Sequence, residues 1–345
     1  MKIAWLLRGW IGVVSLSICL PCRAADEHSA DAGPFVRALW AVQLFGTDAA
    51  ADPRNDERTK LSLASSLAKN GAITKKAVEN QLMDAKTFDR FAGDGPGIDF
   101  ERVRDAIGKE IPASRRRLFP KLAAHLDELT TSFDRIDPSH LKAGEQLADW
   151  IAAHYETGKE LPLVFVCTGN SRRSILGATM ASAAAAYWGL PEIRGYSGGT
   201  EPSAFNPRSV AALRAIGIEI EPTGKEAPRG AEQAPNPIYA VRWGEASDAG
   251  QPGMETLEFS KHYSDFHNPK SGFAALMVCT HADRNCPIVE GASRRISMPY
   301  LDPKAYDGGE YESAKYAERR DDMGRLMLAV MLKARRKLCQ EGKLN

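Results

Sequence analysis

Residues 161–174 read LPLVFVCTGNSRRS, and this stretch decides the fold. Its first six residues form a short, apolar, β-rich run of the kind expected for a central parallel strand that is buried on both faces. The run leads directly into a C-x5-R-S motif, and a helix with an alanine-rich segment is expected from Arg173 to Trp188. Strand, loop and helix in immediate succession predict an α/β domain.

The alternation of strands and helices continues after this stretch. We expect a strand at 193–197, a helix at 207–216, a strand at 274–279 and a long helix at 314–338. Residues 221–271 break the rhythm with many Pro and Gly residues and two short β-like runs, which indicate an inserted loop or hairpin. The fold class predicted for residues 158–345 is therefore an open, mainly parallel α/β sheet with flanking helices.

Residues 25–157 show a different pattern. Their apolar residues recur at helical spacing without strand-like alternation, which predicts an all-α N-terminal region of unknown role. The expected helices are 35–45, 59–67, 75–91, 100–107, 114–132 and 141–155. Residues 93–99 read GDGPGID; they lack the alternating acidic ligands of a calcium loop, and we interpret them as a turn.

Residues 1–24 have the layout of a secretory signal peptide. Two basic residues precede a short apolar run at 10–20, and Ala24 offers a cleavage site. This layout predicts an exported protein, periplasmic or secreted, and the alternative of an uncleaved anchor is weaker because the run is short for a membrane span. The formal net charge is +1, from 45 basic and 44 acidic residues, so no global charge favours binding to nucleic acid or to a membrane surface.

The C-x5-R-S motif carries the chemistry. Backbone N–H groups of a tight loop and of a first helical turn cradle a tetrahedral oxyanion, whose charge the helix dipole also favours. The same field favours the thiolate form of Cys167, which makes this residue the candidate nucleophile. Arg173 is placed to grip two oxygens of the oxyanion, and Ser174 to donate a hydrogen bond to the cysteine sulfur. The predicted oxyanion-binding residues are Thr168, Gly169, Asn170, Ser171, Arg172 and Arg173.

Residues 164–174 resemble the phosphate loop of the low-molecular-weight protein tyrosine phosphatases and of the thioredoxin-coupled arsenate reductases. The similarity continues through SGGT at 197–200 and NPRSV at 206–210, and it extends to the C-terminus. It implies the fold of that superfamily for this part of the chain. Two departures are the insertion at 221–271 and Arg172, which stands where the family often has a second cysteine.

Two further segments resemble this superfamily. Asp302 lies in a Leu-Asp-Pro sequence similar to the family's general-acid loop, which implies that it protonates a leaving group and then activates water. Residues 279–287 read CTHADRNCP and resemble the arsenate reductase segment that carries two cysteines at this spacing. The resemblance implies a relay in which Cys167 attacks arsenate, Cys279 attacks the Cys167 adduct, and Cys286 resolves the resulting disulfide.

Two structural roles compete for Cys279 and Cys286. An oxidising compartment would form and hold a permanent disulfide between them. A zinc site would need further ligands, which His281 alone does not supply. Cys339, in the terminal helix, is expected to be an ordinary thiol, and no metal or other cofactor is indicated.

The predicted function is that of an exported, cysteine-dependent oxyanion enzyme that reduces arsenate to arsenite with an external, thioredoxin-like thiol reductant. The alternative is a phosphomonoesterase of the protein tyrosine phosphatase type, which works through a cysteinyl-phosphate and needs neither Cys279 nor Cys286. A third possibility is a non-catalytic anion-binding or redox-sensing module, which would need no nucleophile and no acid. The expected ligands are arsenate, phosphate or a phosphomonoester, and no nucleic acid.

Overall fold

The computed structural model describes residues 68–69, 72–75, 79, 85–92, 95–99, 112–130, 132–245, 253–286 and 288–344. The predicted signal peptide at 1–24 and the expected helices at 35–45, 59–67 and 100–107 lie outside these residues. Export therefore stays a prediction. None of the described helices is long and apolar enough to cross a membrane.

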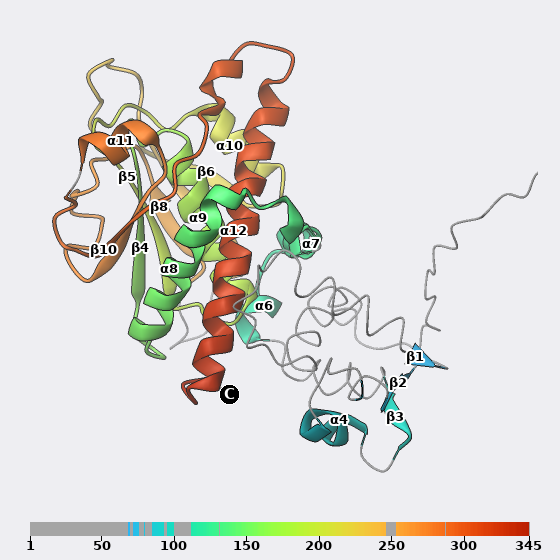
Figure 1. Ribbon diagram of the computed structural model, residues 1–345. Helices are drawn as coiled ribbons and strands as arrows, with labels where there is room; N and C mark the ends of the chain where they lie inside the picture. Colours follow the sequence, from blue (N-terminus) through green and yellow to red (C-terminus); the bar gives the residue numbers. More distant parts are fainter. Residues whose placement is uncertain are drawn as a thin grey trace, which may run out of the picture.

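A four-stranded parallel sheet forms the centre of the fold (Figure 1). Its strands, in the order β10-β9-β4-β5, are Ala292–Ser297, Phe273–Met277, Leu161–Cys167 and Ile193–Gly199. Every residue of β4 is buried, in agreement with its unbroken apolar run. The predicted open α/β fold is confirmed.

β10 is the strand of this sheet that the sequence did not predict. It lies at an edge, reads ASRRIS, and buries only Ile296. A strand with one buried side chain carries neither an apolar run nor the alternation that marks a half-buried strand. This strand is therefore recognised only from its parallel pairing with β9 in the folded protein, and not from its sequence.

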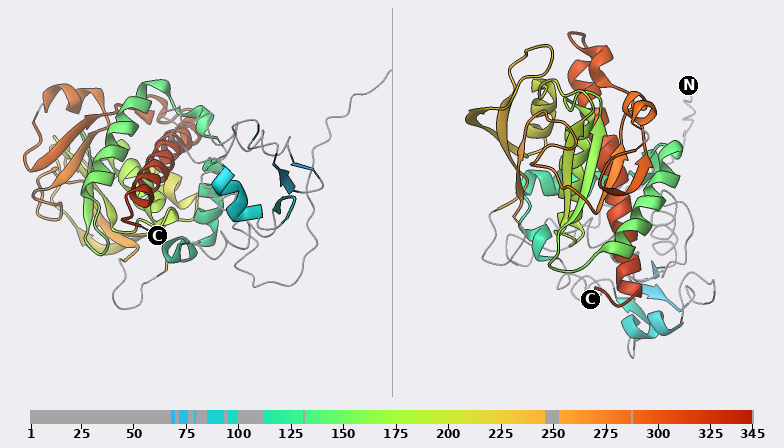
Figure 2. Two further views of the ribbon diagram at one scale, coloured as in Figure 1. Left: turned by 60° about the horizontal axis from the view of Figure 1, so that its bottom comes forward. Right: turned by 90° about the vertical axis from the view of Figure 1, so that its left-hand side faces the viewer.

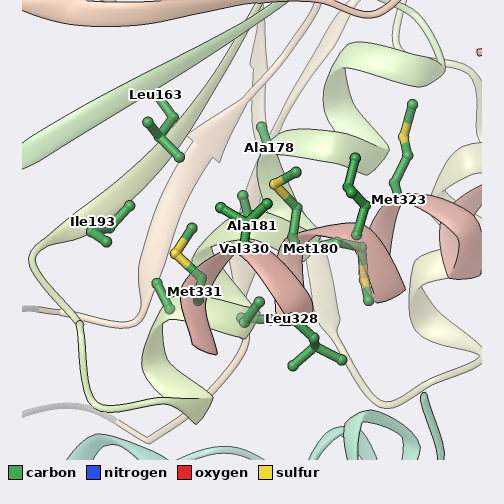
Figure 3. Close-up of a cluster of buried hydrophobic side chains, with 14 of the residues drawn as sticks. Leu163, Ala178, Met180, Ala181, Ile193, Met323, Leu328, Val330 and Met331 are labelled. Carbon is green, nitrogen blue, oxygen red and sulfur yellow. The ribbon is translucent and has the colours of Figure 1, made fainter. Parts of the chain in front are cut away.

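Helices flank the sheet, and three of them lie side by side (Figures 1 and 2). The helices are α8 (Pro138–His154), α9 (Arg173–Tyr187), α10 (Pro207–Arg214), α11 (Thr280–Asn285) and α12 (Glu312–Gln340). α12 runs along both α8 and α9. Side chains of β4, β5, α9 and α12 meet in one buried cluster, which includes Leu163, Ile193, Met180 and Met331 (Figure 3).

Part of the N-terminal region belongs to the same hydrophobic core. α7 (Pro120–Thr130) contributes Leu122 and Leu126, and α8 contributes Leu147, each fully buried, to the cluster that also contains the sheet. α6 (Ala113–Arg116) is tied to α9 by the hydroxyl of Ser114, which donates to the carbonyl oxygen of Ala186 at 2.8 Å. From the sequence, we placed the border between the helical region and the α/β domain at 157–158, shortly before β4. The hydrophobic core continues across this border. These helices therefore pack with the α/β domain from about residue 112 onward.

The described residues before 112 include a helix, three short strands and a few residues in turns or bends. α4 spans Ala85–Ala92, and β1 (Ala68–Lys69), β2 (Ala72–Thr74) and β3 (Gly97–Asp99) form a small antiparallel sheet. Strands of two and three residues are too short to show alternation, so the sequence predicted helices and the turn at 93–99 here, and no strand. β3 ends the segment that we interpreted as a turn.

The insertion forms a three-stranded antiparallel sheet. Its strands, β6 (Glu219–Glu226), β7 (Pro237–Arg242) and β8 (Glu255–Glu258), pair in chain order. Tyr239 packs edge-on against Phe205 with ring centroids 5.3 Å apart, and Trp243 is buried. These aromatic residues thus serve packing within and around the small sheet.

Because α8 shares the core, truncation of Leu147 should destabilise the α/β domain as a whole. We expect Leu147→Ala to lower the free energy of unfolding by about 2–5 kcal/mol, the usual range for a buried leucine. Denaturant unfolding measures this, and Leu257→Ala, at a position 48% exposed on β8, is the control with an expected change within about 0.5 kcal/mol. A loss below about 1 kcal/mol for Leu147→Ala would contradict the shared core.

Candidate active site

The phosphate loop, residues 167–174, joins the carboxyl end of β4 to the N-terminus of α9. Cys167 is 3% exposed, and its Sγ lies 3.1 Å from the Oγ atom of Ser174. The loop packs closely on β5, because a Cβ atom added at Gly199 would lie only 2.5 Å from the carbonyl oxygen of Thr168. The loop thus runs from the end of a buried strand into the N-terminus of a helix, which is the arrangement in which proteins build anion-binding cradles.

Asn170 holds the loop in shape from a left-handed backbone conformation, with φ of 40°. Its Nδ2 donates to the Oγ atoms of Ser174 and Ser197, each at 2.9 Å, and its Oδ1 accepts from the backbone N–H of Lys261. Since the Ser174 oxygen accepts from this amide, its own hydrogen is left to donate to Cys167. The Ser174 hydroxyl is therefore directed at the Cys167 sulfur.

Arg173 and Asp302 are brought together at the mouth of the loop. One terminal nitrogen of Arg173 donates to Asp302 Oδ2 at 2.7 Å, and the other donates to the carbonyl oxygen of Tyr300 at 2.9 Å. Asp302 also caps the short 3-10 helix η3 (Pro303–Tyr306) by accepting from the N–H of Lys304. An oxyanion in the loop would compete with Asp302 for Arg173, which would free the carboxyl group for work on the substrate.

Arg172 turns toward Asp302 and α12. Its Nε donates to the hydroxyl of Tyr316 at 3.0 Å, and its terminal nitrogens lie 3.9 Å from carboxylate oxygens of Asp302 and Asp307. Burial and the hydrogen bond to Asp307 raise the pKa of Tyr316 to about 12, so this hydroxyl stays protonated and donates to Asp307. Arg172 thus joins the phosphate loop to the segment of Asp302 and Asp307 and to α12.

Cys279 lies beside the phosphate loop, and Cys286 lies at the far end of α11. The Sγ atom of Cys279 is 3.4 Å from Thr168 Oγ1 and accepts from the N–H of Ala282, which makes Cys279 the N-cap of the helix. Cys286 follows the last helical residue, and its thiol donates to the carbonyl oxygen of Ile288. Both cysteines are buried and, like Cys167, carry free thiols.

Several residues around the loop were not predicted from the sequence. His281 Nδ1 lies 3.3 Å from Thr168 Oγ1, while its Nε2 faces the amide of Asn285. Ser260, in the insertion, donates to the carbonyl oxygen of Gly169 at 2.9 Å. Nothing in the spacing of a Pro- and Gly-rich insertion marks a residue that supports a loop elsewhere in the chain. His281 could have been found from its place between the two cysteines.

The described residues contain no group of three or more His, Cys, Asp or Glu side chains that could hold a metal ion. The zinc alternative for Cys279 and Cys286 therefore gains no support from their surroundings. Arg172 and Arg173 belong to the phosphate loop itself, and each lies within 4 Å of a carboxylate oxygen of Asp302.

Fold and site define a phosphate-loop domain with a cysteine at the nucleophile position. Residues 162–234 match the family model of the low molecular weight phosphotyrosine protein phosphatases. Two curated relatives, named "Arsenate reductase 2" and "Arsenate reductase" and found in two strains of Staphylococcus epidermidis, are each 25% identical over 157 residues, which is 44% of this chain and 86% of the relative. The chain therefore contains a low-molecular-weight phosphatase domain and is a distant homologue of arsenate reductases, and the predicted resemblance is confirmed.

Arg173→Lys should weaken the binding of phosphate to the loop about 10- to 100-fold, because lysine lacks the planar fork that grips two oxygens. Isothermal titration of the protein with phosphate measures this. Arg208→Lys is the matched control, since Arg208 pairs with Glu312 at 2.6 Å, and we expect less than a twofold change there. Equal phosphate affinities of wild type and Arg173→Lys would show that Arg173 does not bind the anion.

Proposed function

We propose that the chain reduces arsenate to arsenite through a thiol relay of Cys167, Cys279 and Cys286. The observation that carries the proposal is the second thiol beside the phosphate loop, with Cys279 Sγ 3.4 Å from Thr168 Oγ1. β4 and β9 are adjacent parallel strands, so their carboxyl ends bring Cys167 and Cys279 to the same edge of the sheet. Hydrolysis of a phosphomonoester would need only the first of these thiols.

The relay balances in three steps. The Cys167 thiolate attacks the arsenic atom, one arsenic–oxygen bond breaks, and that oxygen takes up a proton from solvent and leaves as water, which gives a sulfur–arsenic adduct. The Cys279 thiolate then attacks the Cys167 sulfur; the sulfur–arsenic bond breaks, and its electron pair reduces As(V) to As(III), which leaves as arsenite. Finally the Cys286 thiolate attacks Cys279 and releases Cys167, so the two electrons come from the Cys279 and Cys286 thiols.

The last step requires α11 to unwind. Cys279 and Cys286 stand at the two ends of this helix. Seven residues of α-helix rise about 10 Å, whereas the Cα atoms of a disulfide lie roughly 4.4–6.8 Å apart. A permanent disulfide between the two cysteines is incompatible with this helix for the same reason. A short helix with exposed polar residues is a suitable element for such a local opening.

An external reductant must restore the thiols after each turnover. The proposal includes a thioredoxin-like protein for this role, and it includes export, so that the reductant would act in the same periplasmic or extracellular compartment. The disulfide to be reduced would join the two ends of α11, where Cys279 is 1% and Cys286 is 8% exposed, and Ile288, two residues beyond Cys286, is 80% exposed.

Phosphomonoester hydrolysis is the second candidate function, and Asp302 is the observation that favours it. The carboxyl group stands at the mouth of the loop, 2.7 Å from Arg173, where a general acid would protonate a leaving alcohol or phenol. The matching family model is named for phosphotyrosine phosphatases. A non-catalytic module is the least supported reading, because the site combines a nucleophile position with an acid.

Arsenate should convert Cys286→Ser into a trapped species. We expect one arsenite per chain and a disulfide between Cys167 and Cys279, because the resolving thiol is missing; wild type should instead form the Cys279–Cys286 disulfide. Disulfide mapping by mass spectrometry on pre-reduced protein, with and without arsenate, checks this. Cys167→Ser should form neither bond, and Cys339→Ser should behave like wild type. A disulfide that forms to the same extent without arsenate would contradict the proposed relay.

Asp302→Asn separates the two candidate functions. If the loop hydrolyses aryl phosphates with Asp302 as the acid, the turnover rate should fall about 10²- to 10⁴-fold, which spectrophotometric release of the phenol measures. The yield of arsenite per chain in a single turnover should stay at one, because arsenite leaves from the sulfur exchange. Loss of both activities together would assign Asp302 a structural role at Arg173.

A further inference from the structure

A cavity lies where the helical region meets the α/β domain. Its volume is about 450 Å³, within the size range of sites that bind small molecules. Its wall combines the 3-10 helix η2 (Phe133–Arg135), the first turn of α8, the segment that leads to Asp302, and α12. None of residues 167–174 lines it. The polar and charged side chains of the wall are Arg135, Asp137, His140, Tyr300, Arg319 and Asp322.

Two buried donors of this wall have no hydrogen-bond partner in the part of the chain that the structure describes. They are the hydroxyl of Tyr300, which is 5% exposed, and the Nε of Arg319, which is 9% exposed. The terminal nitrogens of Arg319 are in use, because one donates to Asp322 at 2.9 Å and the other lies 3.6 Å from Glu318. Burial raises the pKa of Tyr300, so its hydroxyl keeps its proton and remains a donor. Buried donors without an acceptor are costly, which indicates that the wall is made to meet one.

The carboxylates of the wall do not supply this acceptor, since both are engaged. Asp322 accepts from two arginine side chains of α12, and Asp137 accepts from the N–H and the hydroxyl of Ser139. Neither carboxylate forms an ion pair with Arg135, whose exposed guanidinium group also lines the cavity. The wall therefore offers two unused donors and one cation that these carboxylates leave unpaired.

We propose that this cavity is a second oxyanion site, which takes the phosphate group of inorganic phosphate or of a small phosphomonoester. The Tyr300 hydroxyl, Arg319 Nε and the Arg135 guanidinium group come from three different segments of the wall. A tetrahedral phosphate has an acceptor oxygen for each of them, whereas a carboxylate has two oxygens in one plane. Arginine is also well suited to phosphate because its guanidinium group is always charged. The inference concerns a site other than the phosphate loop and does not depend on the proposed function.

Tyr300 connects this cavity to the active site. Its side chain lines the cavity, and its ring packs on His140 with ring centroids 4.1 Å apart. Its carbonyl oxygen accepts from Arg173 at 2.9 Å, and its N–H donates to the carbonyl oxygen of Val278 at 3.1 Å. A phosphate on the Tyr300 hydroxyl would thus be linked to the phosphate loop through a single residue. Binding at the two sites must therefore be resolved separately.

Isothermal titration of the full chain with inorganic phosphate tests the proposal. We expect two binding events in wild type, and Arg173→Lys identifies the event at the phosphate loop by weakening it. Tyr300→Phe and Arg135→Gln should each weaken the other event about 10-fold, because each removes a donor to a charged group. Both variants should leave the loop event within about twofold of wild type, since the carbonyl oxygen of Tyr300 remains in place for Arg173.

Two matched controls should retain both binding events with wild-type affinity. Tyr155→Phe also removes a buried hydroxyl, but one that donates to Glu192 at 2.6 Å. Arg229→Gln also removes a guanidinium group from the surface, but one that pairs with Glu226. A single event in wild type, or a second event that either Tyr300→Phe or Arg135→Gln leaves unchanged, overturns the inference. If Tyr300→Phe does not fold, Arg135→Gln decides, since its side chain is exposed.

The same titration with phenyl phosphate distinguishes the two sources of the phosphate group. It is made in the Cys167→Ser chain, which cannot form a cysteinyl-phosphate. Tighter binding of phenyl phosphate than of inorganic phosphate at the cavity would indicate a phosphomonoester, and equal or weaker binding would indicate inorganic phosphate. Failure of arsenate reduction would affect the proposed function and not this site.

Discussion

The side chain of Asn170 is the constraint on which the site depends. Its amide makes three hydrogen bonds, and its backbone takes the left-handed conformation that lets the loop turn back toward α9. The amide directs the Ser174 hydroxyl onto Cys167 and joins the loop to β5 and to the insertion. A substitution that shortened this side chain would break the hydrogen bonds to Ser174, Ser197 and Lys261 together.

The active site is assembled from segments that are far apart in the sequence. In the candidate site the phosphate loop joins β4 to α9, Asp302 contacts its Arg173, and Cys279, the N-cap of α11, lies beside its Thr168. The parallel sheet makes this possible, because the carboxyl ends of β4, β5 and β9 meet at one edge. An anion in this loop would lie near both the carboxyl group of Asp302 and the thiol of Cys279. Hydrolysis would use the first and arsenate reduction the second, which is the physical basis of the two candidate functions.

The local parts of the fold and site were predictable from the sequence. β4, the phosphate loop and α9 follow one another directly in the chain. The apolar run identified the strand, the C-x5-R-S spacing identified the loop, and the alanine-rich segment identified the helix. β10 and the support from Ser260 and Lys261 were not predictable, because an edge strand with one buried residue and polar residues in a Pro-rich insertion resemble solvated segments. Helical periodicity likewise showed that α8 has a buried face but not that α12 covers it.

A crystal structure of the reduced protein with bound arsenate tests the central claim most directly, namely that residues 167–174 form the oxyanion site of a cysteine nucleophile. The account predicts arsenate in the loop, with arsenic beside Cys167 Sγ, two oxygens on the guanidinium group of Arg173, and Asp302 turned from Arg173 to the substrate. Arsenate bound elsewhere, with the Arg173–Asp302 pair still in place, would contradict it.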